Sequence, residues 1–144
     1  MFPDTQIAAA LIQAYRETHY EVRPADTAAF TLHIDQPCAG LRAAHQRHGV
    51  ACSAFITACN PYSQALDDAA NAARQAALLA KLEAQGRRTD AGQGRHPANG
   101  WPAEPSLLVY GLGLEAARAL GRQLEQNAIV WCGADAVPRL VLLR

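Results

Sequence analysis

The chain has 144 residues, 50% of them hydrophobic, and its 13 basic and 13 acidic side chains balance to a formal charge of zero. This balance argues against attraction of the whole molecule to nucleic acid or to an anionic membrane, and the length is typical of one domain with its own core. No apolar run is long enough to span a membrane, and the first residues lack the features of a signal peptide. We therefore expect residues 1–144 to form a single cytoplasmic domain.

The N-terminal part of the chain predicts a helix, a hairpin and a second helix. Asp4 can cap a first helix with one apolar stripe. Residues 20–23 and 30–35 each alternate apolar with polar side chains around a proline-containing turn, which predicts a hairpin with one solvated face. Residues 41–48, followed by Gly49, predict a short helix.

Residues 50–59 are nearly free of charge, and both alternating faces of this segment are apolar or small. A strand covered on both faces has this composition, so we expect it at the centre of the sheet. Pro61 ends the strand because proline cannot continue the ladder. Ser63 or Asp67 then caps an alanine-rich helix that ends before Gly86.

This predicted helix carries two polar residues on the side that also carries its leucines. At about 100° per residue, Asn71 and Arg74 lie close to the direction of Leu78 and Leu82. Such a pair is either satisfied by hydrogen bonds inside the protein or faces a ligand in a crevice at the carboxyl end of the strand. The sequence leaves both alternatives open.

Residues 87–101 are rich in glycine and basic residues and show no hydrophobic periodicity. Connections of this length are usually binding loops, lids or disordered segments. Within them, residues 87–96 hold the only concentrated positive charge in the sequence. We consider two roles for this basic loop, docking of a partner and a solvated connection.

The last third of the chain predicts strands at residues 106–110, 128–132 and 139–143 and a helix at 114–125. Strand, helix and strand of these lengths favour a parallel, right-handed crossover. Gly111 and Gly113 begin a G-x-G-x-x-A pattern that also occurs at dinucleotide sites. A plain turn explains it better, because too little chain follows for a doubly wound sheet.

The four cysteines form no C-x-x-C pair, and two of them lie in the apolar segment 50–59. This favours buried free thiols and a reducing compartment. His45, His48 and Cys52 match no standard zinc spacing. We expect no metal site and no cofactor.

Four segments form an ordered set of motifs: FITACNPYS at residues 55–63, NAAR at 71–74, WPAEPS at 101–106 and QNAIV at 126–130. This set resembles a bacterial family that is catalogued as domain of unknown function 3293. The resemblance covers nearly the whole chain and implies one intact domain, but it implies no activity and no catalytic residues. The residues that it places in the shared motifs include Asn60, Ser63, Asn71, Arg74, Glu104, Gln126 and Asn127.

Together these patterns predict an α+β domain with a mixed sheet of about six strands and about four helices. Our leading hypothesis is a pocket for a small anionic ligand at the corner formed by residues 60–63. Ser63 and the first amides of the helix would hold an oxyanion, and Arg74 would pair with its charge. The residues expected to complete the pocket are Asn60, Asn71, Gln126 and Asn127.

Whether the protein is an enzyme stays open at this point. If it is one, Glu104 is the candidate general acid or base, and an internal salt bridge between Glu104 and Arg74 is the alternative role. A competing hypothesis is a protein interaction module that uses the basic loop 87–96 and an exposed hairpin edge. In a third hypothesis the polar motif residues only tie loops to the core.

Overall fold

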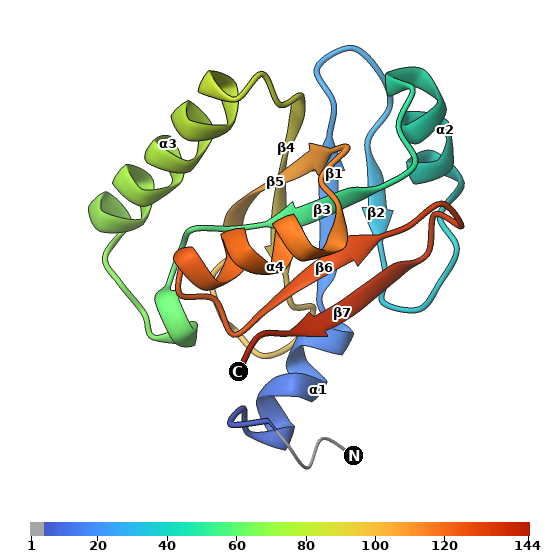
Figure 1. Cartoon of the computed structure of the whole chain (residues 1–144). Helices are drawn as coiled ribbons and strands as arrows, with labels where there is room; N and C mark the ends of the chain where they lie inside the picture. The colour runs from blue at the N-terminus through green and yellow to red at the C-terminus, as the bar shows by residue number, and fades with distance from the viewer. Residues whose placement is uncertain (1–4) are drawn as a thin grey trace.

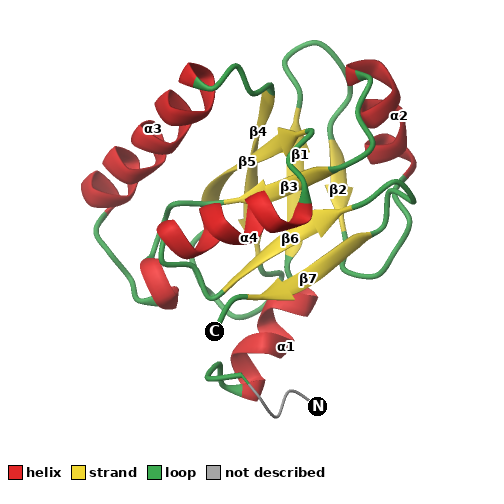
Figure 2. Cartoon of the chain, in the orientation of Figure 1, coloured by secondary structure: helices red, strands yellow, loops and turns green. Residues whose placement is uncertain are grey.

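A computed structural model describes residues 5–144, which form four α-helices and one seven-stranded sheet (Figures 1 and 2). The helices are α1 (Ala9–Glu17), α2 (Ala39–His48), α3 (Asp68–Ala84) and α4 (Leu114–Gln123), and a short 3₁₀ turn, η1, covers Pro61–Ser63. The strands are β1 (His19–Arg23), β2 (Phe30–Leu32), β3 (Ser53–Ile56), β4 (Thr89–Arg95), β5 (Glu104–Tyr110), β6 (Ala128–Cys132) and β7 (Pro138–Leu142). The predicted α+β class is confirmed, with one strand more than expected.

The strands of residues 5–144 pair in the order β2-β1-β4-β5-β3-β6-β7, and every pairing is antiparallel. The expectation of a mixed sheet is therefore wrong. β5 and β6, which flank α4 in the sequence, do run in the same direction, but β3 lies between them and pairs with both. The connection through α4 thus skips one position in the sheet, and no parallel pair forms.

β3 is an interior strand, as its composition predicted, but it is shorter than the apolar segment 50–59. Its four side chains are all buried. Ala54 and Ile56 belong to a core that also contains residues of α3 and α4, whereas Phe55 belongs to a second core with residues of α2. After Ile56 the chain leaves the ladder, yet Ala58 and Cys59 remain buried. The apolar segment therefore continues beyond the strand into a buried stretch without regular secondary structure.

The prediction of a basic loop at residues 87–96 is wrong, because most of this segment is β4. This strand lies inside the sheet, between β1 and β5. A Cβ atom at Gly92 would lie 2.3 Å from the backbone oxygen of Glu21 in β1. Glycine thus occupies a position where an interior strand usually carries an apolar residue. The sequence of this segment therefore lacks the hydrophobic pattern that predicts a strand. Arg95 pairs with Glu21 across the same two strands at 3.1 Å.

Local signals at several helix ends agree with the structure. Asp67 caps α3 by accepting a hydrogen bond from the amide of Ala70 at 2.7 Å, and Gly49 ends α2 in the left-handed conformation. The cap expected from Asp4 lies outside the described residues, and α1 begins after Ala8 without a side-chain cap. Within residues 5–144, no helix combines the length and hydrophobicity needed to cross a membrane.

Candidate functional site

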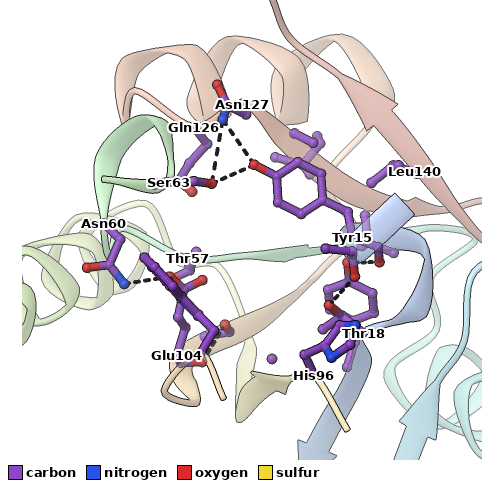
Figure 3. A pocket seen from close by; sticks show the side chains of 18 of the residues that line it. Tyr15, Thr18, Thr57, Asn60, Ser63, His96, Glu104, Gln126, Asn127 and Leu140 are labelled. Atoms are coloured by element: carbon purple, nitrogen blue, oxygen red, sulfur yellow. Dashed lines mark hydrogen bonds between the residues drawn. The ribbon is translucent and has the colours of Figure 1, made fainter. Parts of the chain in front are cut away.

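A cavity of about 170 Å³ lies where the carboxyl end of β3 meets the amino ends of β5 and β6 (Figure 3). Antiparallel pairing brings these three ends together, and α1 contributes Leu11 and Tyr15 to the wall. A cavity of about 150 Å³ is large enough for a molecule the size of benzene. The apolar and aromatic side chains in its lining include Leu11, Tyr15, Tyr20, Phe55, Trp101, Ile129, Val130 and Leu140.

One end of the cavity carries two hydroxyl groups and an amide, which converge in Figure 3. The hydroxyl oxygens of Tyr15 and Ser63 are 2.5 Å apart, and Nδ2 of Asn127 donates to the Tyr15 oxygen at 3.0 Å. Arg144 donates to Oδ1 of Asn127 at 3.2 Å, which turns the amide nitrogen toward the hydroxyls. One hydroxyl donates to the other, and the second hydroxyl proton has no acceptor within residues 5–144.

Ser63 reaches this cluster because the corner after β3 has an unusual backbone. Asn60, Tyr62 and Ser63 all have positive φ, at 47°, 54° and 57°. This conformation is costly for residues other than glycine and collects at functional sites. The amide of Tyr62 donates to the Glu125 oxygen at 2.7 Å and that of Ser63 to the Asn60 oxygen at 2.8 Å. The surrounding structure thus holds the corner in a strained shape that directs Ser63 toward Tyr15.

A second polar cluster surrounds the carboxyl group of Glu104. Its Oε2 atom accepts hydrogen bonds from Nδ2 of Asn60 at 2.5 Å and from the indole Nε1 of Trp101 at 3.3 Å. Within residues 5–144 no group donates to the other oxygen, Oε1. Burial raises the pKa of Glu104 from its ordinary value near 4.5, and the hydrogen bonds from Asn60 and Trp101 oppose this rise.

His96 also lines the cavity, but its ring nitrogens are engaged elsewhere. Nδ1 accepts hydrogen bonds from the amides of Ala98 and Asn99 at 3.1 and 3.0 Å. The proton is therefore on Nε2, which donates to Glu17 at 3.0 Å. Of the carboxyl and imidazole groups in the described lining, Glu104 is therefore the one with a free hydrogen-bonding atom.

Five of the seven residues singled out from the sequence line this one cavity: Asn60, Ser63, Glu104, Gln126 and Asn127. They come from three separated motifs, and the fold places them together. Sequence reasoning missed Tyr15 and Trp101. Tyr15 lies on the apolar stripe of the first predicted helix, a position that indicates packing. Trp101 stands inside the motif WPAEPS, and that motif is the signal that could have identified it.

Asn71 and Arg74 do not line the cavity. Arg74 donates to the main-chain oxygens of Ala58 at 2.6 Å and Leu124 at 2.8 Å, and Asn71 exchanges hydrogen bonds with the backbone and side chain of Asn60. The salt bridge considered between Glu104 and Arg74 is absent from the described residues. For Asn71 and Arg74 the observed contacts are those of the structural alternative.

Comparisons with known proteins give one match. A family model described as "Protein of unknown function (DUF3293)" matches residues 56–129, slightly more than half of the chain. The matched segment contains all seven residues singled out from the sequence and excludes Tyr15. No curated protein and no solved structure matches the chain.

Proposed function

The chain belongs to the DUF3293 family of proteins of unknown function, and from the geometry of its cavity we propose that this cavity binds a small organic molecule. The observation that carries the proposal is an apolar wall between two polar clusters, each with one unused hydrogen-bonding group. Pockets of this composition, with few polar groups in fixed positions, are typical of small-molecule sites. The strained corner at Asn60 to Ser63 supports the same conclusion.

Glu104 is the residue that we propose for chemistry on the bound molecule. A buried carboxyl group whose pKa is raised exchanges a proton closer to neutral pH than an exposed one does. Its free Oε1 atom is the place for that exchange. Asn60 and Trp101 act as positioning residues, because both donate to Oε2 and so fix the carboxyl group.

The cavity residues are better candidates for the function than the segment 87–96, because that segment forms an interior strand with few free groups. Its Arg88 donates to the main-chain oxygen of His48 and its Arg95 pairs with Glu21. The four cysteines are free thiols, which agrees with the reducing, cytoplasmic location that we propose.

A fragment screen by NMR tests the proposal with a reporter inside the cavity and a control outside it. The indole of Trp101 donates to Glu104, whereas the indole of Trp131 donates to the oxygen of Leu112. We expect several fragments of about the size of benzene to shift the Trp101 indole resonance and to leave that of Trp131 in place.

Two variants of β4 locate the binding. Gly94 lines the cavity, and a Cβ atom there would meet Thr18 and Tyr20 at ordinary contact distances of 3.7 and 3.8 Å. Gly94→Val should fill part of the cavity and abolish the fragment shifts, whereas Ala91→Val on the exposed side of the same strand should keep them. The proposal is wrong if no fragment moves Trp101, or if Gly94→Val binds as the wild type does.

A further inference from the structure

The charge of the cavity lining is one-sided. Glu104 contributes a carboxyl group, and no lysine or arginine side chain lines the cavity within residues 5–144. Arg74, which sequence reasoning assigned to an anionic ligand, is bound to two main-chain oxygens outside the cavity. The described lining therefore provides no lysine or arginine to pair with a buried anion, and a buried charge without a partner is costly.

In the part of the chain that the structure describes, the carboxyl group itself has no partner of opposite charge. Both hydrogen bonds to Glu104 come from the neutral groups of Asn60 and Trp101 and reach the same oxygen, Oε2. Oε1 is free to accept a hydrogen bond from a ligand. A donor that carries positive charge makes the stronger bond to a carboxylate, and it would also offset the burial that raises the pKa of this group.

The remaining walls also favour a cation with an apolar body. Four aromatic side chains line the cavity, and aromatic rings attract ammonium groups through their electron-rich faces. At the far end, the Tyr15 and Ser63 hydroxyls hold one proton without an acceptor, which fits an oxygen atom on the ligand. The four aromatic residues are Tyr15, Tyr20, Phe55 and Trp101.

We infer that the cavity selects a compact organic cation, a protonated amine, whose ammonium group donates to Oε1 of Glu104. This inference rests on the proposed function and specifies the ligand class for the same site. The body of the amine packs against Phe55, Val130 and Leu140, which form apolar parts of the lining. The anionic ligand expected from the sequence is replaced by one of opposite charge.

Three probes that share one ring and differ in charge test the inference: benzylamine, benzyl alcohol and benzoate. Each is titrated at pH 7 into the ¹⁵N-labelled wild-type chain, and the Trp101 indole serves as the reporter. We expect benzylamine to bind about tenfold more tightly than benzyl alcohol, a difference of about 1.4 kcal/mol, and benzoate to bind most weakly.

Two glutamate variants assign the preference to one side chain. Glu104→Gln keeps the shape and an acceptor for Asn60 and Trp101, and it should abolish the preference for the amine while benzyl alcohol binds as before. Glu115→Gln removes an exposed carboxylate in α4 that pairs with Arg118, and it should preserve the preference. The Trp131 resonance shows whether each variant is folded. If Glu104→Gln does not fold, the three probes on the wild-type chain alone test the preference for a cation.

The outcomes separate this inference from the proposed function. If benzyl alcohol or benzoate moves Trp101 at least as strongly as benzylamine, the cation inference is overturned and small-molecule binding stands. Retention of the amine preference in folded Glu104→Gln overturns it as well. If none of the three probes binds while other fragments of the screen do, the inference fails and the proposed function survives.

Discussion

Glu104 is a residue whose environment opposes its ionised form. Its pKa is raised by burial, so the folded protein binds the proton more tightly than the unfolded chain does. The free energy contributed by this group is fully present below the ordinary pKa near 4.5 and is lost as pH rises through the folded-state pKa. Glu104 therefore lowers stability at neutral pH, which agrees with the chemical role that we propose for it.

We predict that Glu104→Gln has a higher free energy of unfolding than the wild type at pH 7, and that this advantage disappears below about pH 4. The glutamine oxygen still accepts from Asn60 and Trp101, so the geometry is kept. Urea unfolding of both proteins across this pH range measures the effect. A variant that is destabilised at neutral pH would show that the ionised carboxyl group is structural.

Arg74 is the opposite case, a residue whose polar atoms are used within the fold. We predict that Arg74→Ala lowers the free energy of unfolding by about 2–4 kcal/mol, because two hydrogen bonds from a charged donor to main-chain oxygens are lost. Benzylamine binding should change little in the folded fraction. Arg118→Ala, which removes an exposed pair with Glu115, should cost less than about 1 kcal/mol. Equal costs for the two variants would contradict the structural role of Arg74.

Five of the seven polar residues singled out from the sequence line one cavity, whereas the other two make contacts that the sequence pattern could not specify. Helical spacing placed Asn71 and Arg74 near the leucine stripe of α3, yet it cannot say whether the side chains meet a ligand or the main-chain oxygens after β3. The distinction depends on the left-handed backbone of Asn60, Tyr62 and Ser63, a conformation that asparagine adopts more readily than most residues but that tyrosine and serine do not predict. The role of Tyr15 depends on where α1 packs, which is a tertiary property.

At the scale of elements, β4 was the main omission. Apolar composition and alternation detect strands whose side chains are buried, and β1, β5 and β6 overlap segments that the sequence predicts as strands. β4 contains Gly92 and Gly94 at positions where alternation demands apolar residues. At Gly92 the reason is visible, because the backbone of β1 comes too close for any side chain. Its place in the sheet is therefore set by close backbone approach, which composition does not report.

We predict opposite effects on stability for alanine substitutions at these two glycines. Gly92→Ala should lower stability by at least about 2 kcal/mol, because its Cβ atom would lie 2.3 Å from the Glu21 oxygen and force β1 away from β4. Gly94→Ala should be neutral or stabilise by about 0.4–1 kcal/mol, since its Cβ has room and the unfolded chain loses entropy. Thermal unfolding of the pair checks the contrast. Similar midpoints would argue against the β1–β4 register.

At the scale of the whole molecule, we propose that residues 1–144 form one domain because the two cores share the same strands. Leu107 and Val109 of β5 belong to the core that contains residues of α3 and α4, and Leu108 and Tyr110 to the core that contains residues of α2. α3 buries fewer apolar side chains against the rest of the molecule than the central strands do. It buries only Leu78 and Leu82 among its seventeen described residues, and in Figure 1 it lies at the side of the sheet.

The first half of α3 is instead held by polar contacts with the corner that shapes the cavity. Gln75 accepts from the Ala58 amide at 3.0 Å, and Arg74 and Asn71 bind the same segment. We predict that amides of α3 exchange hydrogen sooner than those of β5, because local opening of α3 exposes little apolar surface. Arg74→Ala should speed exchange in α3 and leave the β5 rates, after correction for global stability, unchanged. Exchange of α3 and β5 at one common rate would contradict this division.

The same contacts would couple α3 to the ligand that we propose for the cavity. Asn71 bonds to Asn60, and Asn60 donates to Glu104, so two side chains connect the helix to the carboxyl group of Glu104. A ligand that binds only while α3 is attached to this corner must stabilise α3 against local opening. The size of this effect is set by the ligand concentration relative to its dissociation constant. Benzylamine at saturation should therefore slow exchange in α3 in the wild type but not in Glu104→Gln. Unchanged α3 exchange in the wild-type complex would place the ligand away from the corner.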